Sequence, residues 1–347
     1  MKRKVKVGNL KTGKNNSITD VFGVKVGHVT YHDDVHHTGV TAIVPKENIF
    51  QEKVLASCYT FNGFGKSIGF MQVEELGTLE TPIILTNTLA VGRAADGLIH
   101  YMLDKNPDIC VKTGSVNPLV MECNDAIVNN IRDIIITKED VYRAIDSASI
   151  DFKQGSHGAG SGMVCHSLKG GIGSSSRVIV VDGKEYTVGV LVNSNFGNSK
   201  DLIFNKTYIG DKIKINDKSK DQGSIAIVVG TDLPLNNLQL KRVAKRAIIG
   251  VTNTGSIASN GSGEMILAFT TANLVPHYGK DKVLDIKSIH NDNIDLVFRA
   301  VIEATEEAVL NSLLENKTIN GYQKKVYALE EFKEAYEDLL IKEGKDV

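Results

Sequence analysis

The tetrapeptide Asn260-Gly261-Ser262-Gly263 offers the clearest candidate for covalent chemistry in this sequence. A serine hydroxyl is a weak nucleophile unless a base removes its proton. If the Gly261–Ser262 bond is cut, Ser262 acquires a free α-amino group, which titrates near about 7.7 and can accept that proton. The small residues around the bond permit the tight turn that an N-to-O acyl shift requires. The tetrapeptide therefore fits either a self-cleaving serine hydrolase or an ordinary glycine-serine loop.

Other motifs with chemical potential are weaker. Ser262 lacks a nucleophile elbow, because Asn260 occupies the place of the first glycine in G-x-S-x-G. The segment NGFGKS ends like a phosphate-binding loop, but Thr60 stands where the earlier glycine is required. The glycine-rich segment 155–162 lacks a dinucleotide fingerprint and is more typical of crowded packing. We therefore predict no nucleotide cofactor.

Metal and thiol chemistry are also disfavoured. The segment HDDVHH contains five possible metal ligands, but it lies in a polar connection that is typical of a solvated loop. The four cysteines are far apart and form no CxxC pair, so we interpret them as buried thiols in a reducing compartment. They are Cys58, Cys110, Cys123 and Cys165. We expect neither a metal nor an organic cofactor.

The elements that must position these residues alternate between strand-like and helical patterns, which predicts a compact α/β or α+β domain. Asp182-Gly183 supplies the positive φ angles of a two-residue hairpin turn, and Thr137 is a candidate helix N-cap. Ser262 lies between a glycine- and serine-rich loop and the apolar run EMILAF. Strands are expected over 23–31, 39–45, 82–88, 175–181, 184–195, 224–229 and 264–269, and helices over 89–103, after 137, and over 237–250, 294–314 and 328–342.

Composition and charge exclude several function classes. The chain has 347 residues and a formal net charge of -1, with 40 Lys+Arg against 41 Asp+Glu. Such a balance provides no positive field for nucleic acid phosphates. The basic N-terminal residues are followed by polar residues rather than an apolar run, and no segment is long and apolar enough to span a membrane. We expect a cytoplasmic protein with one domain, residues 1–347.

A series of long collinear motifs closely resembles the DmpA-like family of L-aminopeptidase/D-esterases and β-aminopeptidases, also called the P1 peptidase family. The resemblance extends from about Ile18 to Ser312. The motifs are ITDVFGVKVGH, FNGFGKS, QVEELGTLETPIILTNTLAVG, TGSVNPLVMECND, GAGSGMVCHSLKGGIGSSSR, YTVGVLVNSNFG, TDLPL, NGSGEMILAF and EATEEAVLNSL.

The resemblance implies a four-layer αββα sandwich related to ornithine acetyltransferase. It also implies that the chain cuts itself after Gly261 into an α chain, 1–261, and a β chain, 262–347, which stay associated and assemble as a homotetramer. The implied activity is release of N-terminal residues from small peptides, amides or esters, with Ser262 as nucleophile. Two alternatives stay open: an acyltransferase of the ornithine acetyltransferase type, which uses threonine instead, and an uncleaved binding or assembly module.

Further site residues follow only from the resemblance. Asn195, in the family's N-F/Y-G motif, would donate its amide to the oxyanion, although a turn asparagine would look the same. Thr305 and Glu307 match an S/T-x-E pattern that supports catalysis. On a helix these two positions are about 200° apart, so the alternative is one capping-competent polar residue and one surface acid.

Two positions depart from the family pattern. Ile127 stands where the family often has an active-site tyrosine, so a hydroxyl that assists oxyanion or substrate binding is absent. Glu264 stands where aspartate is common, which keeps the charge but lengthens the side chain. We expect the first change to alter activity or specificity.

Overall fold

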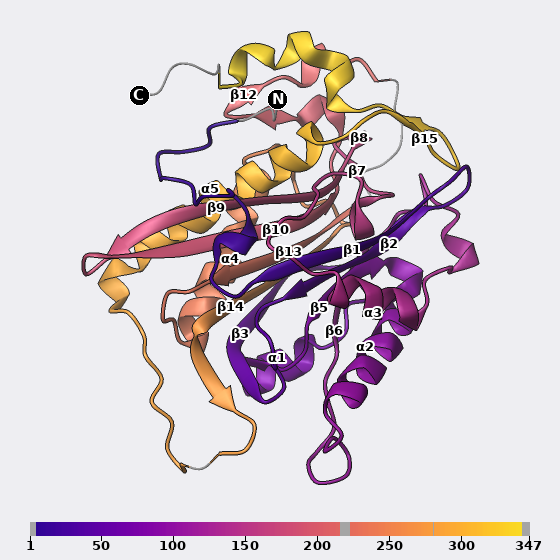
Figure 1. The fold of residues 1–347 in the computed structure, drawn as a ribbon. Coiled ribbons are helices and arrows are strands. Elements are labelled where there is room, and N and C mark those ends of the chain that lie inside the picture. Colours follow the sequence, from indigo (N-terminus) through magenta and orange to yellow (C-terminus); the bar gives the residue numbers. More distant parts are fainter. Residues whose placement is uncertain (1–4, 216–222, 280, 342–347) are drawn as a thin grey trace.

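Two β-sheets pack face to face, and helices cover both outer faces (Figure 1). The computed structural model describes residues 5–215, 223–279 and 281–341. The predicted αββα sandwich is confirmed. Within the described residues, no helix combines the length and apolar character needed to cross a membrane.

The smaller sheet has the strand order β1-β2-β5-β6. Its outer face is covered by α2 (Val91–Lys105) and α3 (Lys138–Asp146), whose apolar sides pack on strand residues such as Val40 and Ile84. β1 and β2 are antiparallel, whereas β5 and β6 are parallel. The strands are β1 (Lys25–His32), β2 (His37–Val44), β5 (Ile83–Asn87) and β6 (Leu119–Cys123).

The larger sheet has the order β4-β3-β14-β13-β10-β9. Its strands are β4 (Thr78–Leu79), β3 (Glu52–Gly63), β14 (Gly263–Pro276), β13 (Ser224–Thr231), β10 (Lys184–Asn195) and β9 (Gly171–Val181). In β13, Ile225 and Ile227 face the helix layer, while Ala226 and Val228 face the other sheet. Because side chains alternate along a strand, β13 fills two cores at once.

The helix layer over the larger sheet consists of α4 (Asn237–Thr252) and α5 (Ile294–Leu314). β13 and β14 are parallel neighbours, so a crossover must return the chain between them. α4 makes that return and ends at the edge where both strands begin. The loop that follows α4 therefore delivers Ser262 to the start of a central strand.

Further short elements lie outside the two main sheets. They are α1 (Phe70–Leu76) and the hairpins β7 (Val164–Cys165) with β8 (Leu168–Lys169), β11 (Ile203–Phe204) with β12 (Thr207–Tyr208), and β15 (Ile319–Asn320) with β16 (Lys325–Val326). The β7–β8 hairpin lies beside the C-terminal end of β10, where Val164 N–H donates to Asn195.

Local sequence signals are largely confirmed. Asp182 and Gly183 adopt φ angles of 49° and 76° between β9 and β10. Thr137 and Asp140 form a capping box at the start of α3. The expected tail helix over 328–342 is wrong in type, because the described part forms 3-10 turns over Leu329–Ala335 and Glu337–Leu339; Lys342 lies outside the described residues.

The tail departs from an α-helix for a packing reason. Phe332 leaves helical geometry, with φ −117° and ψ 38°. Leu329 and Tyr336 are both buried in the core under α5, and the Tyr336 ring packs on Phe204. Tertiary packing of these side chains overrides the helical propensity of the charged sequence between them.

Candidate active site

Ser262 lies immediately before β14 and is almost fully buried, with 1% of its surface exposed. Its backbone N–H donates to the Ser259 carbonyl at 2.8 Å, and Asn62 Nδ2 donates to the same oxygen at 2.9 Å. A Cβ on Gly263 would approach the Phe64 carbonyl to 2.6 Å, so this position requires glycine. The nucleophile candidate is therefore held between a pinned loop and a rigid strand.

Two buried carboxylates lie beside this position. The Ser262 hydroxyl donates a hydrogen bond to Glu264 Oε1. Glu122, in β6 of the opposite sheet, accepts from the Lys66 backbone N–H at 3.0 Å and from the Thr88 hydroxyl. Besides burial, Glu122 and Glu264 both raise the pKa of the Cys123 thiol. Glu122 lies near Gly65, which itself lies against Gly263, so both acids are close to the candidate nucleophile.

Asn195 ends β10 and belongs to the same edge of the sheet. It pairs with Ser224 of β13, which pairs in turn with Gly263 of β14. Asn195 Oδ1 accepts from the Val164 backbone N–H at 2.8 Å, and Asn195 Nδ2 donates to the Asn124 carbonyl at 2.9 Å. The amide is therefore fixed in one orientation, and its Nδ2 retains a second proton for another acceptor.

Thr305 and Glu307 lie on different faces of α5, as their spacing predicts. Thr305 Oγ1 donates to the Val301 carbonyl at 2.7 Å, and the Thr305 Cβ lies close to Gly250 of α4. Glu307 forms a buried ion pair with Arg177 at 2.6 Å and accepts from Asn16. Thr305 thus packs between two helices, and Glu307 is not the surface acid of the alternative interpretation.

The structure does not bring Glu307 to Ser262. Its partner Arg177 pairs with Val188, which pairs with Thr231, which pairs with Thr270 of β14. The strand from Gly263 to Thr270 is roughly 20 Å long at the rise of an extended strand. The ion pair of Glu307 consequently lies toward the other end of the sheet.

Glu306 was not singled out from the sequence and lies on the side of α5 that faces α4. It is buried, with 2% exposed, and Oε2 accepts from Asn253 Nδ2 at 2.8 Å at the base of the loop that ends on Ser262. Burial raises the pKa of Glu306. Among the described residues its Oε1 has no hydrogen-bond partner. The segment EATEEA contains two adjacent glutamates, Glu306 and Glu307. Only the packing of α5 against α4 decides which of them faces Asn253.

Ile127 occupies the turn that follows Asn124. Its side chain is half-buried, and its carbonyl accepts from the Gln323 backbone N–H at 3.1 Å. The turn in which the family often has a tyrosine is therefore present here. It lies next to Asn124, whose carbonyl accepts from Asn195. The side chain at this place provides apolar surface and no hydroxyl.

The remaining sequence-level interpretations have mixed outcomes. Cys58, Cys123 and Cys165 are buried, but Cys110 is exposed, because it lies in an irregular loop at positive φ. Within the described part of the chain, no group of three His, Cys, Asp or Glu side chains is placed to hold a metal ion. The Lys66 backbone N–H already binds a carboxylate, which opposes a phosphate site at NGFGKS.

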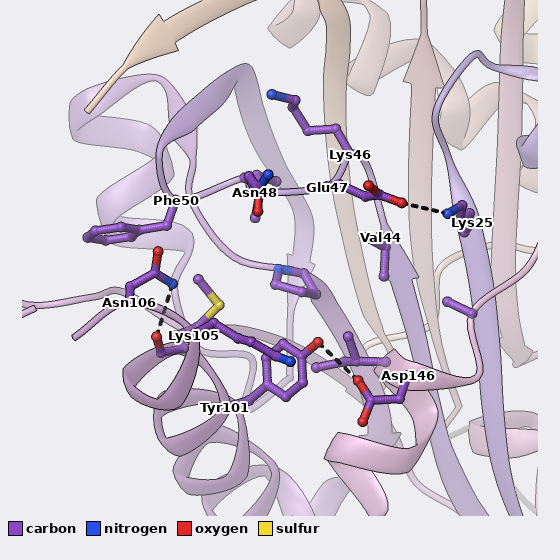
Figure 2. A pocket seen from close by; sticks show the side chains of 15 residues that line it. Lys25, Val44, Lys46, Glu47, Asn48, Phe50, Tyr101, Lys105, Asn106 and Asp146 are labelled. Carbon is purple, nitrogen blue, oxygen red and sulfur yellow. Dashed lines mark hydrogen bonds and ion pairs between the residues drawn. The ribbon is translucent and has the colours of Figure 1, made fainter. Parts of the chain in front are cut away.

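The pocket in Figure 2 lies elsewhere. It has a volume of about 410 Å³ and is formed by the β2–β3 connection and the C-terminal ends of α2 and α3. Lys25 and Glu47 form an ion pair across its rim, and Tyr101 donates to Asp146 at its floor. None of the candidate site residues contributes to it, so we do not assign the reaction to this pocket.

Comparisons with known proteins show the family to which the chain belongs. The sequence model of peptidase family S58 matches residues 16–327. β-Peptidyl aminopeptidase BapA of Sphingosinicella microcystinivorans is 36% identical over 338 residues, which cover 90% of this chain and 84% of the relative. The BapA protein of Sphingosinicella xenopeptidilytica is also 36% identical, over 91% of this chain and 85% of the relative.

Solved structures show the same architecture. The PH0078 protein of Pyrococcus horikoshii OT3 superposes with a TM-score of 0.91 at 48% identity, covering 95% of this chain and 96% of that chain. The L-aminopeptidase D-Ala-esterase/amidase of Ochrobactrum anthropi, a variant of the Ntn hydrolase fold, gives 0.90 at 31% identity, covering 98% and 100%. A β-aminopeptidase of Burkholderia sp. gives 0.89 at 31%, covering 99% and 98%.

Proposed function

Because this chain belongs to peptidase family S58 and is an aminopeptidase of the Ntn hydrolase fold, we propose that Ser262 is its nucleophile and that the Gly261–Ser262 bond is its self-cleavage site. One observation carries the proposal. The Ser262 hydroxyl donates to the buried carboxylate of Glu264 at the junction of a loop and a central strand. That contact provides a proton acceptor for the first attack.

The self-cleavage step uses water as its only co-reactant. Ser262 Oγ attacks the Gly261 carbonyl carbon as Glu264 accepts the hydroxyl proton. The C–N bond breaks, the proton passes to the leaving nitrogen, and an ester links Gly261 to Ser262 Oγ. Water hydrolyses this ester. The products are a chain that ends in the Gly261 carboxylate and a chain that begins with the free amine of Ser262.

Turnover of substrate repeats the same chemistry with a new base. The Ser262 α-amine takes the hydroxyl proton as Oγ attacks the scissile carbonyl, and the leaving amine receives that proton. The acylated Ser262 is then hydrolysed by water. The remaining Nδ2 proton of Asn195 is proposed to stabilise the oxyanion, because the amide orientation is fixed from both sides. Ile127 contributes no second donor.

We propose that Glu122 and Glu264 favour a substrate with a free N-terminal amine. An ammonium group that reaches these carboxylates would form a charge-assisted hydrogen bond with them. An internal peptide segment carries no such charge. We propose that Glu122 recognises the substrate amine. The curated relatives suggest testing substrates with β-amino acid as well as α-amino acid N-termini.

For Thr305 and Glu307 we propose a supporting role. Thr305 fits α5 against Gly250 of α4, and Glu307 ties α5 to Arg177 of β9. These contacts fix the helix layer over the strands that carry Ser262 and Asn195. Neither side chain needs to touch the substrate for this role.

The assembly and the cellular location of the protein are separate parts of the proposal. We propose one domain that becomes an α chain of residues 1–261 and a β chain of residues 262–347, which remain associated, form a homotetramer, reside in the cytoplasm and require no cofactor. Native mass spectrometry would report the tetramer. Cell fractionation would report the location.

N-terminal sequencing and intact mass of purified protein test the proposal directly. A fragment that begins SGEMIL, together with hydrolysis of amino acid amides, is the expected result. Ser262→Ala should remain one chain and hydrolyse nothing. An uncleaved wild-type chain without activity would favour a binding module, and acyl transfer to an amine acceptor without hydrolysis would favour the acyltransferase alternative.

A further inference from the structure

Lys169 is a buried lysine that the proposed reaction does not use. It lies in β8, and its side chain is fully buried. Its ammonium donates to three backbone carbonyls: Gly160 at 3.1 Å, Met163 at 2.9 Å and Gly170 at 2.6 Å. Among the described residues, no carboxylate forms an ion pair with it. Burial lowers the pKa of the Lys169 ammonium to about 7, although the nearby Cys165 and Asp125 partly offset this shift.

The ammonium acts on a single peptide group that reaches the active site. The carbonyl of Met163 and the N–H of Val164 belong to the same planar peptide unit. Lys169 Nζ donates to this carbonyl at 2.9 Å, and the N–H donates to Asn195 Oδ1 at 2.8 Å. Asn195 Nδ2 then donates to the Asn124 carbonyl. Hydrogen bonds in such a chain orient and polarise one another.

Lys169 is not needed to satisfy the carbonyls it contacts. Gly160 O also accepts from Met163 N at 3.3 Å, and Met163 O from Gly170 N at 3.0 Å. Gly170 O also accepts from Asn316 Nδ2 at 3.1 Å. Each carbonyl would therefore keep one donor if the ammonium were absent. What the lysine adds in its protonated form is a positive charge beside the peptide unit that holds Asn195.

We propose that Lys169 is a positioning residue for Asn195: through the Met163–Val164 peptide, its ammonium orients the Asn195 amide and strengthens the donor that faces the oxyanion. The inference rests on the proposed function, in which Asn195 stabilises negative charge on the substrate carbonyl oxygen. Negative charge that develops only in the transition state would profit from an existing buried cation nearby. The effect should therefore appear in kcat rather than in KM.

Lys169→Met tests the inference, because methionine fills a similar volume without the charge. We expect kcat for an amino acid p-nitroanilide to fall about 10- to 100-fold, the range that small misplacements of catalytic groups produce, with KM within about threefold. Rates are divided by the concentration of cleaved chain that begins at Ser262. Lys53→Met is the matched control, since Lys53 is a largely buried cation at the opposite end of β3, paired with Glu80 at 2.8 Å. It should leave kcat unchanged.

A double-mutant cycle separates positioning from a general structural effect. In an Asn195→Ala background, Lys169→Met should lower kcat no further, because the amide through which it acts is gone. If Lys169→Met does not fold, Lys169→Gln keeps a hydrogen-bond donor without the charge and enters the same cycle. An equal loss in both backgrounds, or an unchanged kcat in a folded variant, would overturn the inference. If Asn195→Ala itself leaves kcat unchanged, the oxyanion assignment of the proposed function fails instead.

Discussion

Replacing Glu122 by glutamine isolates its charge as a determinant of substrate recognition. Glutamine keeps the length of the side chain and an oxygen that can accept from the Lys66 N–H, but it removes the negative charge that the substrate ammonium would meet. Glu122 is only 5% exposed, so water would screen the pairing weakly. The substitution should therefore weaken amine binding while leaving the turn around Lys66 in place.

The expected size follows from the contact. A hydrogen bond to a charged group is worth about 1.5–3 kcal/mol. Because Glu264 remains and keeps part of the attraction, we expect the lower half of that range, which corresponds to about a 10- to 40-fold loss in kcat/KM. The ammonium is charged in both the bound substrate and the transition state. The loss should therefore appear mainly as a higher KM.

Steady-state kinetics on an amino acid p-nitroanilide, with the cleaved fraction measured on a denaturing gel, gives both constants. Glu80→Gln is the control, since Glu80 is an equally buried acid that pairs with Lys53 at the opposite end of the sheet. It should lower the melting temperature and leave KM unchanged. If Glu122→Gln also lowers only the melting temperature, Glu122 is a structural acid and the recognition argument is refuted.

Four further outcomes are expected. Ser262→Ala should run as one intact, inactive chain on a denaturing gel; cleavage at the same bond would refute the nucleophile assignment. Glu307→Gln should lower the free energy of unfolding by about 2 kcal/mol, because Arg177 loses one of two charged partners, yet keep kcat within threefold; a large loss of kcat in folded protein would make Glu307 catalytic. Activity should survive chelators and thiol-blocking reagents, and a metal-reversible loss would contradict this. Burial raises the pKa of Asp125 from 3.8 to about 7, so between pH 4 and 7 the folded protein holds a proton that the unfolded protein has lost. The free energy of unfolding should therefore fall by up to about 1.4 kcal/mol per pH unit as the pH rises through this window. Asp125→Asn should lack this component in urea unfolding at pH 5 and pH 7, and the same pH dependence in both proteins would contradict it.

Several strands and helices and the position of Ser262 could be predicted because their signals are local, whereas β3 and β6 were not predicted. Asp182-Gly183 fixes a hairpin through backbone geometry alone, and Thr137 caps α3 through a contact three residues away. The run EMILAF is typical of a strand and directly follows a glycine- and serine-rich loop. Ser262 therefore lies at the junction of a loop and a strand whichever fold contains these two segments. The sandwich itself followed from the family resemblance rather than from these patterns.

The composition of the site could not be predicted, because it depends on contacts between distant segments. Glu122 comes close to Gly65, which lies against Gly263, only because the two sheets pack face to face, and no spacing in the sequence encodes that proximity. Glu307 is 130 residues from Arg177, which takes it away from the nucleophile. Glu306, its neighbour, faces Asn253 instead. Two neighbouring residues of one helix thus make different contacts: Glu307 pairs with Arg177, whereas Glu306 binds Asn253 at the base of the loop that ends on Ser262.

The central place of β14 has a consequence for the strength of the association between the two proposed chains. β14 lies between β3 and β13, hydrogen-bonded on both sides, and its own chain continues into α5 of the covering layer. Residues 5–261 alone would therefore present a sheet with a missing inner strand and two facing, unpaired edges. Such a scaffold is a ready acceptor for strand insertion. Separately expressed segments split at Gly261 should reassemble by complementation, with Ser262 already at the N-terminus, and activity regained on mixing would report the insertion without any peptide bond being cut.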